Sequence, residues 1–175
     1  MKHRLLLLLL LLTTMPSWAA QPATSSGQRT AAIRPSKLGA ELRTSWLGMP
    51  KQQFRRLVPE QRLGAPSSIS YYTRPGEPLV LGGYRVTGIS YGFYKDQLCC
   101  IEVRVLGEAN CRGIQALLTS SYGPASSATG QRWENAQLRL LYNEMPKGYA
   151  TVVVASPSLL AQYQAEQLLA PNEAV

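Results

Sequence analysis

Residues 84–106 read YRVTGISYGFYKDQLCCIEVRVL, and this stretch decides the fold. Its first half alternates, which is typical of a strand with two different faces. One of these faces carries Thr87, Ile89, Tyr91 and Phe93. Residues 95–96 then make a tight connection into a second apolar run at residues 99–106, where Ile101, Val103 and Val105 form one aliphatic face. The stretch therefore predicts an antiparallel hairpin.

The segments on both sides of this hairpin are expected to form helices and further strands. Residues 50–58 begin with a proline that suits the first helical turn, and Pro59 follows them, so they predict a helix. Apolar side chains at helical spacing predict a second helix at residues 108–122, and a third is expected to start from Ser156. Further strands are expected at residues 68–73, 131–135, 137–143 and 149–155. This pattern predicts an α+β fold, an antiparallel sheet with helices packed on one face, in the order helix-βββ-helix-βββ-helix.

Residues 1–19 are predicted to be a cleavable signal peptide. They combine the cationic start MKHR, a leucine run at residues 5–12, and small residues at Ser17 and Ala19 before the cleavage point. The leucine run is much shorter than the about 20 apolar residues of a membrane span. No cysteine lies near the cleavage point to carry a lipid. We therefore expect a secreted or periplasmic protein that is soluble after signal-peptide cleavage and has no transmembrane anchor.

Composition divides the remaining chain into three parts. Residues 20–43 are polar, small and proline-flanked, and are expected to form a flexible N-terminal linker. Residues 44–169 suit a single α+β domain, since domains commonly have about 100–200 residues. Residues 170–175 are expected to be a disordered tail.

Basic residues outnumber acidic ones, with 18 Lys and Arg against 10 Asp and Glu. Losing Lys2 and Arg4 with the signal peptide leaves 16 against 10, a net charge of +6. The basic residues form no clustered stripe, which argues against nucleic acid as a partner. A mildly cationic surface that faces acidic cell-surface polymers is the simpler interpretation.

The composition also excludes several kinds of chemistry. The only histidine, His3, belongs to the predicted signal peptide, so Ser-His-Asp and Cys-His mechanisms are excluded after cleavage. The usual zinc sites are excluded for the same reason. Asp96 is the only aspartate, which argues against carboxylate-rich calcium and magnesium sites. We expect no catalytic residue, no metal site and no cofactor.

The second face of the strand at residues 84–94 is the candidate partner surface. It comprises Tyr84, Val86, Gly88, Ser90, Gly92 and Tyr94. Glycine inside a strand often marks the close approach of another backbone or a ligand, and exposed tyrosines suit protein recognition. The alternative is that a helix or the N-terminal segment covers this face.

The cysteines Cys99, Cys100 and Cys111 are expected to be free and buried. Adjacent strand residues point to opposite faces, so Cys99 and Cys100 are poorly placed to bond to each other. Cys99 is expected roughly 20 Å from the strand end near Cys111. A disulfide needs Cα atoms within about 7 Å, so a Cys99–Cys111 bond requires the helix to cross the strand steeply.

Several turn and core positions resemble the BamE-like repeat family. The matching stretches are LGMPK at residues 47–51, GAP at 64–66, the tyrosine pair at 71–72, and F-x-x-D-x-L-x-x-I at 93–101. Residues 46–106 and 108–155 then resemble two degenerate repeats, a tandem similar to the β-lactamase-inhibitor-protein fold. The chain departs from the family because it lacks the lipid-anchoring cysteine and its Gly-x-Pro comes late. The resemblance implies a module that binds another protein or an envelope component.

The first functional hypothesis is therefore an exported, non-catalytic interaction module. A second is a carrier of a small ligand or lipid, with a pocket between sheet and helices. A third is a histidine-free exported enzyme that uses a cysteine thiolate or glutamates, as paired-carboxylate glycosidases do. For that enzyme, Glu102 and Glu134 are the acidic residues expected within strands.

Overall fold

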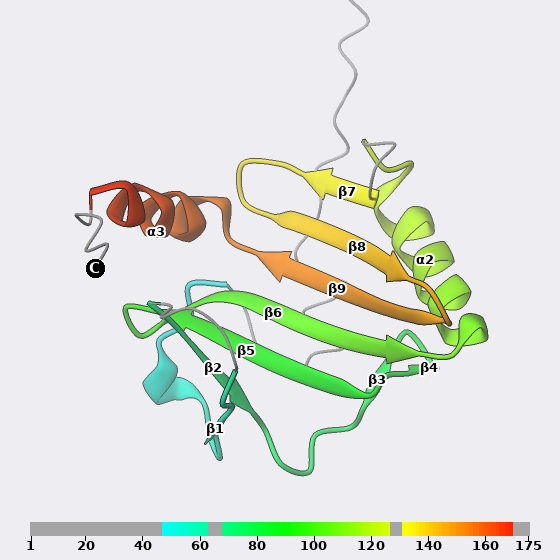
Figure 1. Ribbon diagram of the computed structural model, residues 1–175, viewed down its shortest axis with the longest axis horizontal. Helices are drawn as coiled ribbons and strands as arrows, with labels where there is room; N and C mark the ends of the chain where they lie inside the picture. Colours follow the sequence, from blue (N-terminus) through cyan, green and yellow to red (C-terminus); the bar gives the residue numbers. More distant parts are fainter. Residues whose placement is uncertain (1–46, 63–67, 127–130, 170–175) are drawn as a thin grey trace, which may run out of the picture.

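The computed structural model describes residues 47–62, 68–126 and 131–169 (Figure 1). The predicted signal peptide, the linker and the tail lie outside these described residues. Most strands form one seven-stranded antiparallel sheet in the order β1-β2-β5-β6-β9-β8-β7, and β3 and β4 form a separate hairpin. The strands are β1 (Val58–Pro59), β2 (Ile69–Thr73), β3 (Val80–Leu81), β4 (Tyr84–Arg85), β5 (Gly88–Tyr94), β6 (Gln97–Leu106), β7 (Gln131–Glu134), β8 (Arg139–Met145) and β9 (Tyr149–Ala155).

The predicted hairpin is confirmed as the pair β5 and β6 at the centre of the sheet. Its register runs from Gly88↔Arg104 to Tyr94↔Gln97. The predicted first strand is shorter than expected, because Tyr84 and Arg85 turn away to pair with β3. Gly82 and Gly83 have φ of 57° and 83° and form the tight turn between β3 and β4, a backbone that favours glycine.

The main core lies between the sheet and α2 (Glu108–Tyr122), the helix predicted at these residues. It buries the strand side chains Ile89, Tyr91 and Phe93 against the apolar side of this helix. The buried residues of α2 are Cys111, Ile114, Leu118 and Tyr122. Their spacing places them on one side of the helix, so local sequence and tertiary packing agree here.

The predicted arrangement of helices on one face is wrong, because the two α-helices pack on opposite faces of the sheet. The helix α3 (Pro157–Leu169) contributes Leu159 to a second, smaller cluster with Tyr94, Cys99 and Cys100. Tyr94 points away from its neighbour Phe93, which lies in the α2 cluster. The described residues are thus mostly antiparallel sheet with two short α-helices, and within them the order helix-βββ-helix-βββ-helix does not hold (Figure 1).

The predicted first helix at residues 50–58 is also wrong. These residues form one 3-10 turn, η1 (Lys51–Gln53), and then lead into the edge strand β1. Both ends are held by distant backbone: Leu98 N–H donates to the Met49 carbonyl, and Val58 pairs with Thr73. The segment between them is too short for a stable helix, since isolated short helices are marginal.

The two proposed half-repeats share one sheet, because β6 of the first half pairs with β9 of the second along seven residues from Cys100↔Ala155 to Leu106↔Tyr149. The edges are short strands, β1 on one side and β7 on the other. Short edge strands limit pairing with other chains.

Candidate functional site

The six residues of the predicted partner surface do not form one exposed face. Gly88, Ser90, Gly92 and Tyr94 are buried on the face opposite α2. Val86 lies in the main core, and Tyr84 is partly exposed on β4. The alternation of β5 was therefore assigned correctly, but both of its faces are covered.

The glycines of this face are required by neighbouring side chains of the same sheet. A Cβ on Gly88 would lie 2.7 Å from Arg104 Nη2, and a Cβ on Gly92 would lie 2.5 Å from Cys100 Sγ. The close approach expected at these glycines is thus made by the adjacent strand β6. A bulky replacement at Gly92 would push against Cys100 of β6, and one at Gly88 would displace the Arg104 guanidinium from Glu60, so neither reports on partner binding alone.

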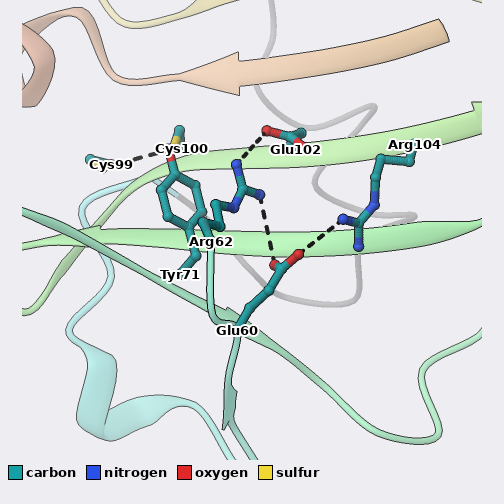
Figure 2. A network of polar contacts seen from close by, with 7 residues as sticks. All are labelled: Glu60, Arg62, Tyr71, Cys99, Cys100, Glu102 and Arg104. Carbon is teal, nitrogen blue, oxygen red and sulfur yellow. Dashed lines mark hydrogen bonds and ion pairs between the residues drawn. The ribbon is translucent and has the colours of Figure 1, made fainter. Parts of the chain in front are cut away.

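A polar network covers the buried face of β5, and Figure 2 shows its side chains. Arg104 Nη1 donates to Glu60 Oε1 at 2.9 Å, and Arg62 Nη1 donates to Glu102 Oε2 at 3.0 Å. Arg62 Nη2 also lies 3.7 Å from Glu60 Oε2. The Arg62 guanidinium stacks on the Tyr71 ring, 3.6 Å from its centroid. The arrangement links the residues after β1 to β2 and β6, so its first role is structural.

Sequence reasoning missed this network, although its signal is present. Glu60-x-Arg62 and Glu102-x-Arg104 carry opposite charges at spacing two, so each pair projects from one side of an extended chain. Residues 59–62 follow the predicted helix, and no strand is predicted there. The contacts arise because β1 pairs with β2 at the edge of the sheet.

The carboxyl of Glu60 is electrostatically stabilised as a carboxylate. Burial raises its pKa, but the Ser90 hydroxyl and the guanidinium groups of Arg104 and Arg62 outweigh burial and hold the pKa below its ordinary value. A carboxyl whose pKa is lower when folded stabilises the protein above its unfolded pKa. That contribution is lost as the pH falls through the folded pKa.

We expect acidification between about pH 5 and pH 3 to lower the melting temperature, with Glu60 responsible for part of the fall. Glu60→Gln should remove on the order of 1 kcal/mol of this pH-dependent stability, a modest value for a partly exposed pair. Thermal unfolding at a series of pH values measures the slope. Glu60→Gln should change the slope more than Glu108→Gln does, because Glu108 is an exposed carboxylate on α2. An identical slope for Glu60→Gln and the parent chain would contradict the assignment.

The three cysteines are unpaired and buried. Cys99 and Cys100 lie on the same face, contrary to the expectation from alternation. The register shifts between Gly92 and Phe93, which pair with Cys100 and Leu98, so Cys99 is the extra residue of a β-bulge. At a β-bulge, two successive residues point to the same face of the sheet. The sulfur atoms of Cys99 and Cys100 therefore lie 3.9 Å apart.

This sulfur contact is too long for a disulfide, whose S–S bond is about 2.05 Å. The hydrogen bond from the Cys99 thiol to Cys100, together with burial, raises the pKa of Cys99, and the same hydrogen bond lowers the pKa of Cys100. Cys111 lies in the α2 cluster on the other face of the sheet, so it does not approach Cys99. Burial separates all three thiols from solvent substrates.

Two surface hollows lie along the connection between β2 and β5. The first is a groove of about 510 Å³ between the β3–β4 hairpin and the junction of β6 with α2. Its lining is Leu79, Val80, Arg85, Val86, Thr87, Leu106 and Asn110. The second is a pocket of about 150 Å³ beside the turn that follows β2, and arginines line it.

Within the described residues, no group of three or more His, Cys, Asp or Glu side chains is placed to hold a metal ion. In the same residues, no helix is long and apolar enough to cross a membrane.

Comparison with protein-family models, with curated proteins and with solved structures finds no match to this chain. The resemblance to BamE-like repeats therefore stays a prediction.

Proposed function

We propose that the protein is an exported, non-catalytic interaction module, and that its groove binds an extended segment of a partner protein. The observation that carries this proposal is the gathering of exposed aliphatic side chains in one hollow. Leu79 and Val80 are each 43% exposed and Leu106 is 54% exposed. All three line the same groove.

The groove favours a segment with aliphatic side chains and an acidic residue. Burying exposed aliphatic surface stabilises a complex by about 25 cal/mol per Å² of apolar area. Arg85 is the one charged residue of the lining and is exposed, so a carboxylate beside the aliphatic groups would complement it. The excess of 18 basic over 10 acidic residues in the chain favours the same choice.

The chemistry of the lining supports binding over catalysis. Its polar side chains are those of Arg85, Thr87 and Asn110, which can orient a ligand by hydrogen bonds. The enzyme hypothesis uses a cysteine thiolate or glutamates; the cysteines are buried, and the lining of this groove contains neither a cysteine nor a glutamate. The predicted signal peptide supports export.

The test is selection of random peptides, displayed on phage, on the immobilised full chain. We expect the selected peptides to share aliphatic residues beside an aspartate or glutamate. A synthetic peptide of that consensus should lose at least tenfold in affinity towards Leu106→Glu, because the new carboxylate repels the ligand and removes apolar contact. Fluorescence polarisation measures the affinity.

The matched control is Leu168→Glu, which makes the same chemical change at an 87% exposed leucine of α3. It should bind the consensus peptide as the parent chain does. Failure to enrich any peptide would overturn the proposal. Equal binding by Leu106→Glu and the parent would move the partner site away from the groove. A bound small molecule that displaces every peptide would favour the carrier hypothesis.

A further inference from the structure

The pairing of β1 with β2 brings two arginine-bearing segments together. Val58 pairs with Thr73 in antiparallel register. The chain leads away from that pair as residues 55–57 on one side and residues 74–76 on the other. The pocket of about 150 Å³ lies between these segments. Its lining is Arg55, Arg56, Arg74, Pro75, Gly76, Glu77 and Pro78.

The wall at residues 74–77 is a rigid turn. Glu77 N–H donates to the Arg74 carbonyl at 3.3 Å, which closes the turn. Pro75 fixes one central dihedral, and Gly76 takes the positive φ of 77° that the second central position of a type II turn requires. A rigid turn loses little conformational freedom when a ligand binds.

The opposite wall is strained. Arg56 has a φ of 58°, a left-handed backbone that a non-glycine residue adopts at a cost of about 1–3 kcal/mol. Strain of this kind gathers at sites where function requires one backbone geometry. Here the left-handed residue lies in the two-arginine segment that faces the turn.

The charges of the pocket leave two guanidinium groups available. Arg74 Nη1 lies 3.5 Å from Glu77 Oε1, and the Tyr91 hydroxyl donates to the same oxygen at 2.6 Å. Glu77 is thereby neutralised, and its side chain is only 7% exposed. Arg55 and Arg56 are exposed, and within the part of the chain that the structure describes neither has a hydrogen bond or ion pair.

We propose that this pocket binds a phosphate group. Three guanidinium groups and one carboxylate give the lining a net charge of +2, which matches the about −2 charge of a phosphate near neutral pH. Guanidinium groups bind phosphate oxygens through paired hydrogen bonds. The volume holds several water-sized groups of about 30 Å³ each, which is room enough for a tetrahedral oxyanion. The site is independent of the groove, because the two linings share no residue.

The experiment is isothermal titration of the full chain with inorganic phosphate, and sedimentation with phosphatidylcholine vesicles that contain phosphatidic acid. Binding in both arms assigns the phosphate group itself as the ligand, and binding to vesicles alone assigns a phosphorylated headgroup. Arg55→Gln combined with Arg56→Gln should weaken binding by tenfold or more in whichever arm binds. Arg112→Gln is the matched control for Arg55→Gln alone, because each removes one positive charge from an exposed arginine.

A second variant separates binding from folding. Arg56→Gly removes the left-handed strain, so it should raise the melting temperature while it weakens phosphate binding. Absence of binding in both arms would overturn the proposal. So would equal loss in Arg112→Gln and Arg55→Gln, which would indicate general electrostatic attraction. A lower melting temperature with unchanged binding in Arg56→Gly would also contradict the role given to this residue.

Discussion

Replacing Gly148 with alanine is expected to lower the free energy of unfolding by about 2–4 kcal/mol. Gly148 lies in the loop between β8 and β9 with a φ of 67°, a backbone that favours glycine. An added Cβ would lie 2.9 Å from the Glu108 backbone nitrogen and 3.4 Å from the Gly107 carbonyl carbon. These are main-chain atoms at the start of α2, so they cannot rotate away as a side chain would.

The backbone around Gly148 has little freedom to relieve this contact. Gly107 N–H donates to the Gly148 carbonyl at 2.7 Å, and the Cys111 thiol donates to the same oxygen at 3.4 Å. The loop thereby holds the first turn of α2 against the start of β9. Displacing it would disturb both hydrogen bonds and the buried end of the helix.

The matched control is Gly83→Ala in the β3–β4 turn. Gly83 has a φ of 83°, but nothing lies within 4 Å of its added Cβ. This variant should cost only about 1 kcal/mol, the cost of a left-handed alanine without a clash. Urea unfolding of both variants measures the difference. Equal losses of unfolding free energy in the two variants would show that the contact between the added Cβ of residue 148 and the start of α2 costs nothing beyond the left-handed backbone.

The parts of the fold predicted correctly are those specified by local sequence. The helix at residues 108–122 was placed at its observed bounds because Ile114, Leu118 and Tyr122 repeat at helical spacing and Gly123 ends it. The β5–β6 hairpin likewise combines alternation with a short turn. In both cases the signal lies within one continuous stretch.

The errors arose where distant backbone decides the structure. Residues 50–58 have local helix signals, but Met49 pairs with Leu98 and Val58 pairs with Thr73, which leaves the segment mostly extended. The orientation of Cys99 depends on a bulge, and alternation counted along one strand cannot detect an extra residue. Which face of the sheet α3 covers is also decided by contacts between residues that are far apart in the sequence.

The residues of the two candidate sites also come from separate stretches of the sequence, so local patterns do not indicate them. Arg55 and Arg56 belong to the segment predicted as a helix, and residues 74–78 lie between the strand predicted at residues 68–73 and the hairpin. Only the register of β1 on β2 places them around one pocket. The groove gathers residues from the β3–β4 hairpin, the end of β6 and the start of α2, and no pattern within one of these segments indicates it.

The largest loss from a single side-chain truncation in α2 is expected for Leu118→Ala, at about 2–5 kcal/mol of unfolding free energy. Leu118 has no exposed surface and belongs to the cluster between α2 and the sheet. Truncation removes three carbons and leaves a cavity that the close-packed side chains of this cluster can fill only in part. Urea unfolding gives the value.

A double-mutant cycle with Leu159→Ala tests the corrected architecture directly. Leu159 is the buried residue of α3 and belongs to the second cluster, across the sheet from Leu118. Residues without shared partners lose stability additively, so the coupling energy between the two truncations should be below about 0.5 kcal/mol. Leu118→Ala with Ile114→Ala, within one cluster, should couple more strongly. Strong coupling between Leu118 and Leu159 would instead place both helices in one layer, because only residues of a shared core redistribute the same cavity.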